Sequence, residues 1–151
     1  MLFRSEQFLS ARFSPITAVL AAAMIFTFAM FASRATLQPD PEVAAPGAIA
    51  YAKSHGLDGN VLNSYNLGGA LILNGIKTYI DGRTDQLFLG GFTLADDATK
   101  KGKGLDEILA RHDISWAILA TKDLRIPMFD AKPGWKRVFS DADASIYVRI
   151  P

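Results

Sequence analysis

Residues 114–120 read ISWAILA, an almost continuous apolar run. Seven residues is a typical strand length, and such a run indicates a strand that is buried on both faces. Strands of that kind occur mainly in sheets that carry helices on both sides. The run therefore predicts a buried strand of an α/β domain.

Helix and strand patterns alternate on either side of this run. Helices are expected at 48–54, 67–73 and 105–111, and strands at 60–64, 77–80, 114–120, 135–140 and 145–150. The last two strands flank Asp141-Ala142-Asp143, which is typical of a hairpin turn. Strands that alternate with helices predict a small three-layer-like α/β domain. Its sheet is expected to be mostly parallel, with a C-terminal antiparallel hairpin.

The N-terminal part carries a long uncharged stretch. Residues 14–33 read SPITAVLAAAMIFTFAMFAS, and Arg12 and Arg34 flank them. About twenty apolar residues cross a ~30 Å hydrocarbon core as a helix, so a transmembrane helix is expected at 14–34. A signal peptide is the alternative, although its apolar part is usually only about 7–15 residues long. A buried core helix is disfavoured, because the rest of the chain is too small to surround it.

The charges beside this helix predict its orientation. Arg4, Arg12 and the α-amino group precede it, and only Arg34 follows closely. Lys and Arg favour the cytoplasmic side, and acidic residues contribute little. Residues 1–13 are therefore expected in the cytoplasm, with the helix in the inner membrane. The C-terminal domain is expected on the extracytoplasmic side, and the lipid bilayer is the expected partner of the helix.

Composition restricts the function of the remainder. Residues 35–46 contain three prolines, which favour an extended linker, and the globular domain is expected at 47–151. The net charge of +1 argues against a nucleic-acid partner. With no cysteine, disulfides, Cys-ligated zinc and thiol nucleophiles are excluded. No cofactor is expected.

The first candidate site is the segment NSYNLGG at residues 63–69, between an expected strand and an expected helix. Its candidate ligand-binding residues are Asn63, Tyr65, Gly68 and Gly69. The two glycines would leave amides at the start of the helix open to an anion. Alternatively, they simply allow the strand and the helix to pack closely.

The second candidate site is the segment YIDGRTDQ at residues 79–86. Its candidate residues are Asp81, Gly82, Arg83 and Asp85. Ligands of open α/β sheets bind beyond the carboxyl ends of the strands, where Asn63 and Asp81 would lie side by side. Arg83 would hold a carboxylate or phosphate with its planar fork, or would pair with Asp81 or Asp85 and pin the loop.

A metal centre is not expected from these carboxylates. Asp81, Asp85, Asp96 and Asp97 are the residues that would form it. Their spacing does not follow the pattern of a calcium-binding loop.

Several of these motifs together resemble a known family. VLNSYNLGGALI, YIDGRTD, WAIL and GWKRVFSDADASIYVR look like the C-terminal soluble domain of bacterial polytopic membrane proteins. Those proteins are mostly uncharacterised, and their membrane parts are similar to C-type glycosyltransferases that use polyprenyl-phosphate sugars. The resemblance covers about residues 46–150 and the last membrane helix. It implies that the catalytic carboxylate of such enzymes lies in an early extracytoplasmic loop, which this sequence lacks.

Two functional hypotheses follow. In the first, the chain is a membrane-anchored accessory domain, or the C-terminal part of a multi-pass membrane protein, and is non-catalytic alone. Other membrane-protein segments are then expected partners, and Met1 would be an internal start. In the second, it is part of a membrane glycosyltransferase, and the edge formed by Asp81, Arg83 and Asp85 binds a lipid-linked sugar. A secreted ligand-binding domain would require cleavage near Ala35.

Overall fold

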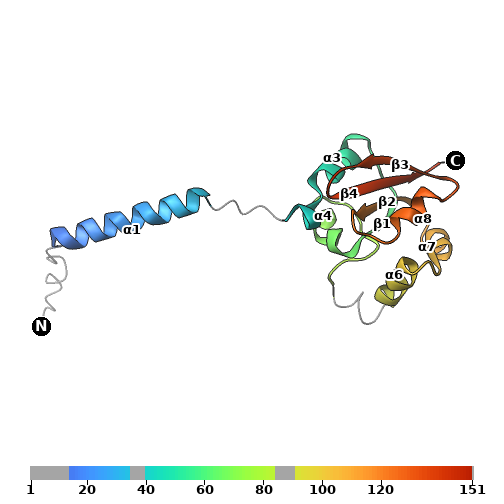
Figure 1. Cartoon of the computed structure of the whole chain (residues 1–151), viewed down its shortest axis with the longest axis horizontal. Helices are drawn as coiled ribbons and strands as arrows, with labels where there is room; N and C mark the ends of the chain where they lie inside the picture. Colours follow the sequence, from blue (N-terminus) through green and yellow to red (C-terminus); the bar gives the residue numbers. More distant parts are fainter. Residues whose placement is uncertain (1–13, 35–39, 84–90, 151) are drawn as a thin grey trace, which may run out of the picture. The chain divides into compact units, whose positions relative to one another are not determined.

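The structure of the chain is a computed structural model that describes residues 14–34, 40–83 and 91–150. It divides into two units, Met1–Gln38 and Pro39–Pro151. Figure 1 shows the elements of each unit, which are described separately below. The expected residue Asp85 lies outside the described residues.

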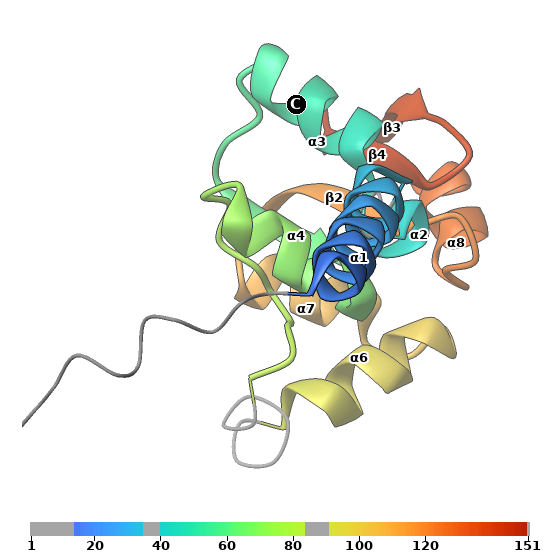
Figure 2. The same ribbon diagram turned by 90° about the vertical axis from the view of Figure 1, so that its left-hand side faces the viewer.

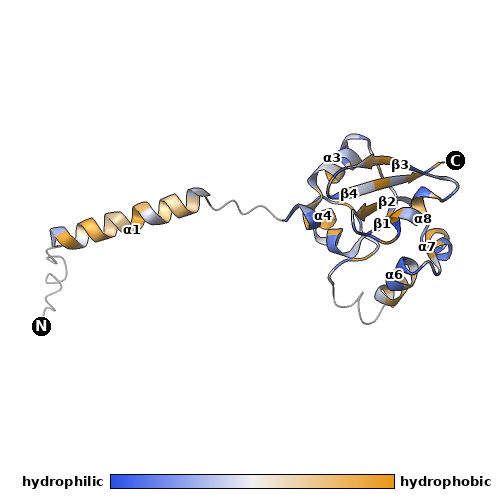
Figure 3. Ribbon diagram, viewed as in Figure 1, coloured by the Kyte–Doolittle hydropathy of each residue, from blue (hydrophilic) through white to orange (hydrophobic). Residues whose placement is uncertain are grey.

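The first unit contains one helix, α1 (Pro15–Arg34). Ser14 precedes it, and its Oγ accepts a hydrogen bond of 3.3 Å from the Ile16 N–H, which caps the first turn. Apolar residues occur along the length of α1 (Figure 3), and their large side chains are exposed. The segment Pro15–Ser33 is long and apolar enough to cross a membrane, a test that an N-terminal signal sequence also passes. Because the chain buries none of it, a core helix is not supported.

The second unit is built on a mixed four-stranded sheet. Its strands are β1 (Asn60–Asn63), β2 (Ile114–Ala120), β3 (Trp135–Ser140) and β4 (Ala144–Arg149), in the order β1-β2-β4-β3. β2 pairs with β1 in parallel and with β4 antiparallel, and β4 pairs with β3 antiparallel. The α/β class and the C-terminal hairpin are thus confirmed. The mostly parallel three-layer arrangement is not confirmed, since only β1 and β2 run parallel.

The strand expected at 77–80 does not form, and the side chain of Asn63 explains why. Its Oδ1 accepts hydrogen bonds from the Tyr79 N–H at 2.9 Å and the Ile80 N–H at 3.3 Å. Its Nδ2 donates to the Ile80 carbonyl at 2.8 Å. A buried amide side chain therefore pairs with backbone groups that a neighbouring strand would otherwise satisfy. The segment crosses the end of β1 and leaves that strand at the edge of the sheet.

Short helices surround the sheet. They are α2 (Pro41–Ala44), α3 (Pro46–Ser54), the 3-10 helix η1 (Tyr65–Leu67), α4 (Gly68–Leu73), α6 (Phe92–Lys100), α7 (Leu105–Arg111) and α8 (Ile126–Asp130). The expected helices at 48–54, 67–73 and 105–111 correspond to α3, α4 and α7. The extended backbone expected up to residue 46 is not found from 41 onward. Pro41 and Pro46 instead occupy first helical turns, where a missing N–H costs nothing.

The side chains of β2 alternate between two apolar clusters. Trp116 and Ile118 pack with residues of α3 and α4, including Ile49 and Leu71. Leu119 and its neighbours on the other face pack with residues of α7 and α8. The strand is therefore buried on both faces, as the continuous apolar run predicts.

The role of Asn63 gives a first testable prediction. Asn63→Ala leaves the Tyr79 and Ile80 amides and the Ile80 carbonyl without their partner. We expect a loss of at least about 1–3 kcal/mol in the free energy of unfolding. Urea unfolding of the full chain in a mild detergent, followed by tryptophan fluorescence, measures it. Hydrogen exchange at the Tyr79 and Ile80 amides should also accelerate.

The matched control is Asn66→Ala. Asn66 is exposed, and its amide makes one bond of 2.9 Å to the Glu42 carbonyl. The free energy of unfolding of the Asn66→Ala variant should differ from that of the wild type by no more than about 0.5 kcal/mol. Equal effects of the two variants would contradict the role assigned to Asn63.

Candidate functional site

Polar residues gather at the carboxyl ends of the two parallel strands. β1 ends at Asn63 and continues into Ser64, and β2 ends at Ala120, three residues before Asp123. Residues 77–80, which we call the crossing segment, bring Asp81 to the same edge. Asn63 holds Tyr79 and Ile80, which precede Asp81, by hydrogen bonds. This edge is where ligands bind in open α/β sheets, so it is the candidate site.

Asp81 and Arg83 form a bidentate ion pair within one turn. The Arg83 Nε donates to Asp81 Oδ1 and its NH2 group to Oδ2, both at 2.8 Å, and the Arg83 N–H donates to Oδ1 at 3.0 Å. Thr78 Oγ1 adds a bond of 2.7 Å to Oδ2. The hydrogen bonds from Arg83 lower the pKa of the buried Asp81 carboxyl to about 2. Asp81 is thus a stable anion and a poor proton acceptor at neutral pH.

A second Asp-x-Arg turn with the same hydrogen bonds follows β2, and its two charged side chains are buried. Arg125 donates from Nε to Asp123 Oδ1 at 2.9 Å and from its NH2 group to Oδ2 at 2.6 Å, and its N–H donates to Oδ1 at 3.0 Å. The Arg125 side chain is 0% exposed, whereas that of Arg83 is 62% exposed. Burial alone would raise the pKa of Asp123, but the guanidinium of Arg125 outweighs it and the pKa falls below its usual value.

Two further residues tie this buried turn to its surroundings. Ser64 Oγ donates to Asp123 Oδ2 and accepts a bond of 2.9 Å from the Ala120 N–H, which joins the ends of β1 and β2. Asp96 of α6 accepts a bond of 2.6 Å from the Arg125 NH1 group, and Lys100 pairs with its other oxygen at 2.6 Å. The network therefore fixes α6 to the sheet edge.

The segment NSYNLGG at residues 63–69 forms η1 and the start of α4. The Gly68 N–H donates to the Tyr65 carbonyl, because η1 leads directly into α4, so this amide is not open to an anion. A Cβ on Gly68 would lie 2.7 Å from Asp81 Cβ and 2.8 Å from the Ile80 carbonyl oxygen. Gly68 thus allows the close packing that was the alternative expectation, here against the crossing segment.

The remaining candidate residues lie on the surface beside this packing. Tyr65 and Gly69 are exposed, and a Cβ on Gly69 would meet nothing within 4 Å. A Cβ on Gly82 would lie 3.7 Å from the Tyr65 hydroxyl, so the two candidate segments adjoin there. The structure does bring together four candidate residues, namely Asn63, Gly68, Asp81 and Arg83. No group of three or more His, Asp or Glu side chains could hold a metal ion in the part of the chain that the structure describes.

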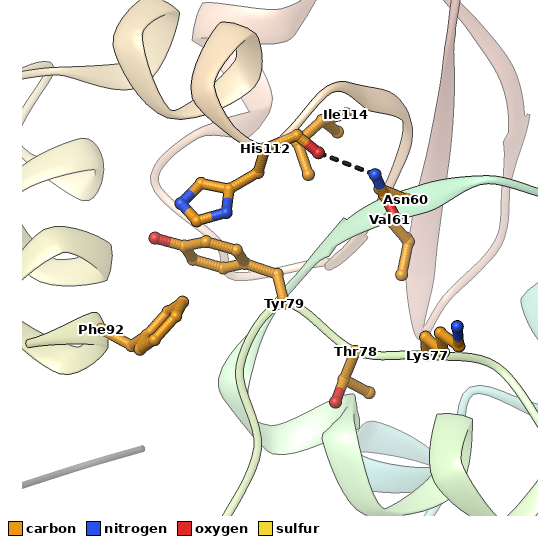
Figure 4. Close-up of a pocket in the computed structure, with 8 residues that line it drawn as sticks. All are labelled: Asn60, Val61, Lys77, Thr78, Tyr79, Phe92, His112 and Ile114. Atoms are coloured by element: carbon orange, nitrogen blue, oxygen red, sulfur yellow. Dashed lines mark hydrogen bonds between the residues drawn. The ribbon is translucent and has the colours of Figure 1, made fainter. Parts of the chain in front are cut away.

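A small hollow opens near the other end of β1 (Figure 4). Its volume is about 250 Å³, which is below the range of about 300–1,000 Å³ for ligand pockets. The Tyr79 ring lies edge-on to His112 at 5.2 Å and to Phe92 at 5.5 Å. Burial raises the pKa of Tyr79, which keeps its hydroxyl neutral. The rings pack on one another, so the hollow is a secondary feature.

The sequence analysis did not anticipate Ser64, Asp96, Asp123 or Arg125 as one cluster. A signal was present in the repeated spacing Asp-x-Arg, since Asp123-Leu124-Arg125 repeats the pattern of Asp81-Gly82-Arg83. Comparison with known proteins adds nothing to it: no family model, curated protein or solved structure matches the chain. The function therefore has to be inferred from the site itself.

The two adjacent glycines give a second prediction. Gly68→Ala forces a methyl group into Asp81 and should lower the free energy of unfolding by about 1–3 kcal/mol. Gly69→Ala places the same methyl group in open space and should be neutral, or stabilising by up to about 1 kcal/mol, because alanine favours a helix. Urea unfolding of both full-length variants distinguishes them. A Gly68→Ala variant as stable as the wild type would contradict the close packing of Gly68 against Asp81.

The ion pair of Asp81 gives a third prediction, on pH. A carboxyl whose folded pKa is lowered stabilises the fold above its unfolded value of 3.8 and loses this contribution as pH falls to about 2. Arg83→Lys loses the bidentate geometry, so the pKa of Asp81 should rise. The variant should be less stable than the wild type at pH 7, and this difference should shrink as pH falls from 3.8 to about 2.

Urea unfolding as a function of pH measures this difference. Arg111→Lys is the matched control, since Arg111 and its partner Glu107 are both exposed and should contribute little. If Arg83→Lys left stability unchanged at every pH, Arg83 would have no structural role. A role in ligand binding would then be favoured.

Proposed function

We propose that the chain is a membrane-anchored domain of the bacterial inner membrane and is non-catalytic alone. It acts as an accessory domain, or as the C-terminal part of a multi-pass membrane protein. The observation that carries this proposal is α1, an apolar helix of twenty residues with exposed side chains. Such a surface favours a hydrocarbon environment, because water does not solvate it well.

The orientation of the anchor is part of the proposal. Arg4 and Arg12 precede α1, and Arg34 ends it. The larger number of positive charges before the helix favours a cytoplasmic N-terminus. The globular domain then lies on the extracytoplasmic side.

Support for a non-catalytic role comes from how the candidate polar groups are used. The Asn63 amide bonds the backbone of the crossing segment. Both oxygens of Asp81 accept hydrogen bonds from Arg83. Asp123 and Asp96 balance the charge of Arg125. These groups hold the fold, and a lowered pKa suits an ion pair better than a general base.

A second candidate function is part of a membrane glycosyltransferase. The observation in its favour is the 62% exposure of the Arg83 side chain at the sheet edge. A substrate phosphate could approach the guanidinium there, with Asp81 and Asp85 completing the edge. In this case Arg83→Lys should weaken binding of a lipid-linked sugar and leave stability unchanged. The pH experiment above separates the two functions.

The topology gives a fourth prediction. Because the natural sequence has no cysteine, single cysteines report on one position each. We choose Lys136→Cys on the exposed side of β3, and Ser5→Cys before α1. In intact cells of a bacterial host, a membrane-impermeant maleimide should label the first variant. It should label the second only after permeabilisation.

Intact mass and fractionation complete the test. The labelled protein should remain in the membrane fraction, at the full chain mass of 16.4 kDa plus the mass of the label. A soluble product cleaved near Ala35 would instead identify a signal peptide and a secreted domain. The reverse labelling pattern would overturn the orientation, and an unlabelled soluble protein would overturn the anchor.

A further inference from the structure

Helix α6 attaches to the rest of the globular unit through polar side chains. It lies at the periphery of this unit in both views (Figures 1 and 2). The two residues that it buries are Asp96 and Thr99, whereas its leucine, Leu94, is 78% exposed. Phe92 and Ala95 are only partly buried against the neighbouring apolar cluster. A surface helix is usually held by a buried apolar stripe, so the attachment of α6 depends on charge to an unusual degree.

One guanidinium makes the polar contact with α6. The NH1 group of Arg125 donates to Asp96 Oδ1 at 2.6 Å and to Thr99 Oγ1 at 3.4 Å. The Nε and NH2 groups of Arg125 instead bond the two oxygens of Asp123. The two sides of the guanidinium thus serve different elements: α6 contacts one side, and the turn after β2 contacts the other.

Separation of α6 from the sheet would leave a partner for each of these charges. Asp96 would keep Lys100, which lies four residues later on the same helix and pairs with its Oδ2 at 2.6 Å. Arg125 would keep its bonds to both oxygens of Asp123. Breaking a buried ion pair is costly chiefly because it leaves an uncompensated charge, and this penalty is avoided here.

The turn at Arg125 can keep its shape without α6. The turn from Asp81 to Arg83 has the same three hydrogen bonds, although 62% of the Arg83 side chain is exposed. Glycines with positive φ lie at both ends of α6, Gly91 at 66° and Gly102 at 76°. Because glycine has access to more backbone conformations than other residues, both ends of α6 can change direction at low cost.

We propose that α6 is a hinged cover of the carboxyl edge of the parallel strands, and that it opens while the sheet stays folded. In the closed form α6 hides the Arg125 side chain, which is 0% exposed. On opening, Phe92 also leaves the rings of Tyr79 and His112, which line the hollow near β1. The cover therefore controls whether a molecule in solution reaches the polar groups at this edge. It would act with or without the membrane anchor.

Hydrogen exchange of the full chain in a mild detergent tests the opening. Amides in the middle of α6 should be less protected than those of β2. Their exchange should change little with low concentrations of urea, because a local opening exposes little surface. Amides of β2 should exchange through global unfolding, so their rates should rise steeply with urea. Equal protection and equal urea dependence in α6 and β2 would overturn the proposal.

A charge variant tests what holds the cover closed. Asp96→Asn keeps the size of the side chain and should speed exchange of the α6 amides about tenfold or more, because a hydrogen bond between charged groups is weakened. Asp97→Asn is the matched control, since Asp97 is on the same helix, 57% exposed and 3.6 Å from Lys100. It should change the exchange by no more than about threefold. Equal effects of the two variants would contradict the role of Asp96.

Labelling with phenylglyoxal, which modifies accessible arginine side chains, tests whether opening uncovers Arg125. Peptide mapping by mass spectrometry follows Arg125 and, as an accessible reference, Arg111, whose side chain is 65% exposed. Asp96→Asn should speed the labelling of Arg125 by the same factor as the exchange of the α6 amides, and Arg111 should react equally in both proteins. If Arg125 reacts only under conditions that unfold β2, α6 does not control access to this edge and the proposal fails.

Discussion

A guanidinium with no exposed surface imposes the main constraint on the globular unit. Arg125 must find its counter-charges inside the protein, because an unpaired buried charge would cost several kcal/mol. Asp123 supplies one from the turn after β2, and Asp96 supplies the other from α6. Ser64 extends the network to the end of β1. The ends of both parallel strands and the position of α6 therefore depend on one side chain.

The two Asp-x-Arg turns show how burial changes the function of the same local geometry. Both place three donors of the arginine on the aspartate two residues earlier, at nearly equal distances. At Arg125 the surroundings are protein, and the guanidinium recruits a second carboxylate. At Arg83 the side chain is 62% exposed and pairs with the Asp81 carboxylate at the surface. The turn itself is local, and its role depends on what packs over it.

The sequence predicted those elements whose pattern is local. The apolar run at 114–120 and the residues 135–140 have the expected strand bounds, and 105–111 has the expected helix bounds. The segment 77–80 has strand-like residues, but its pairing partner is a side chain, Asn63, which no periodicity reveals. α6 has few apolar residues in FTLADDATK, and its position depends on an ion pair with Arg125, 29 residues away. Such long-range polar contacts leave no periodic pattern in the sequence.

The order of the strands has a consequence for synthesis of the protein. β4 lies between β2 and β3, so the sheet cannot close until residues up to Arg149 have left the ribosome. α1 emerges more than a hundred residues earlier, and β1 ends 51 residues before its parallel partner β2 begins. Unpaired strands and exposed apolar surface are prone to aggregation during such an interval. In the proposed anchored form, early insertion of α1 would keep the nascent domain at the membrane surface during that interval.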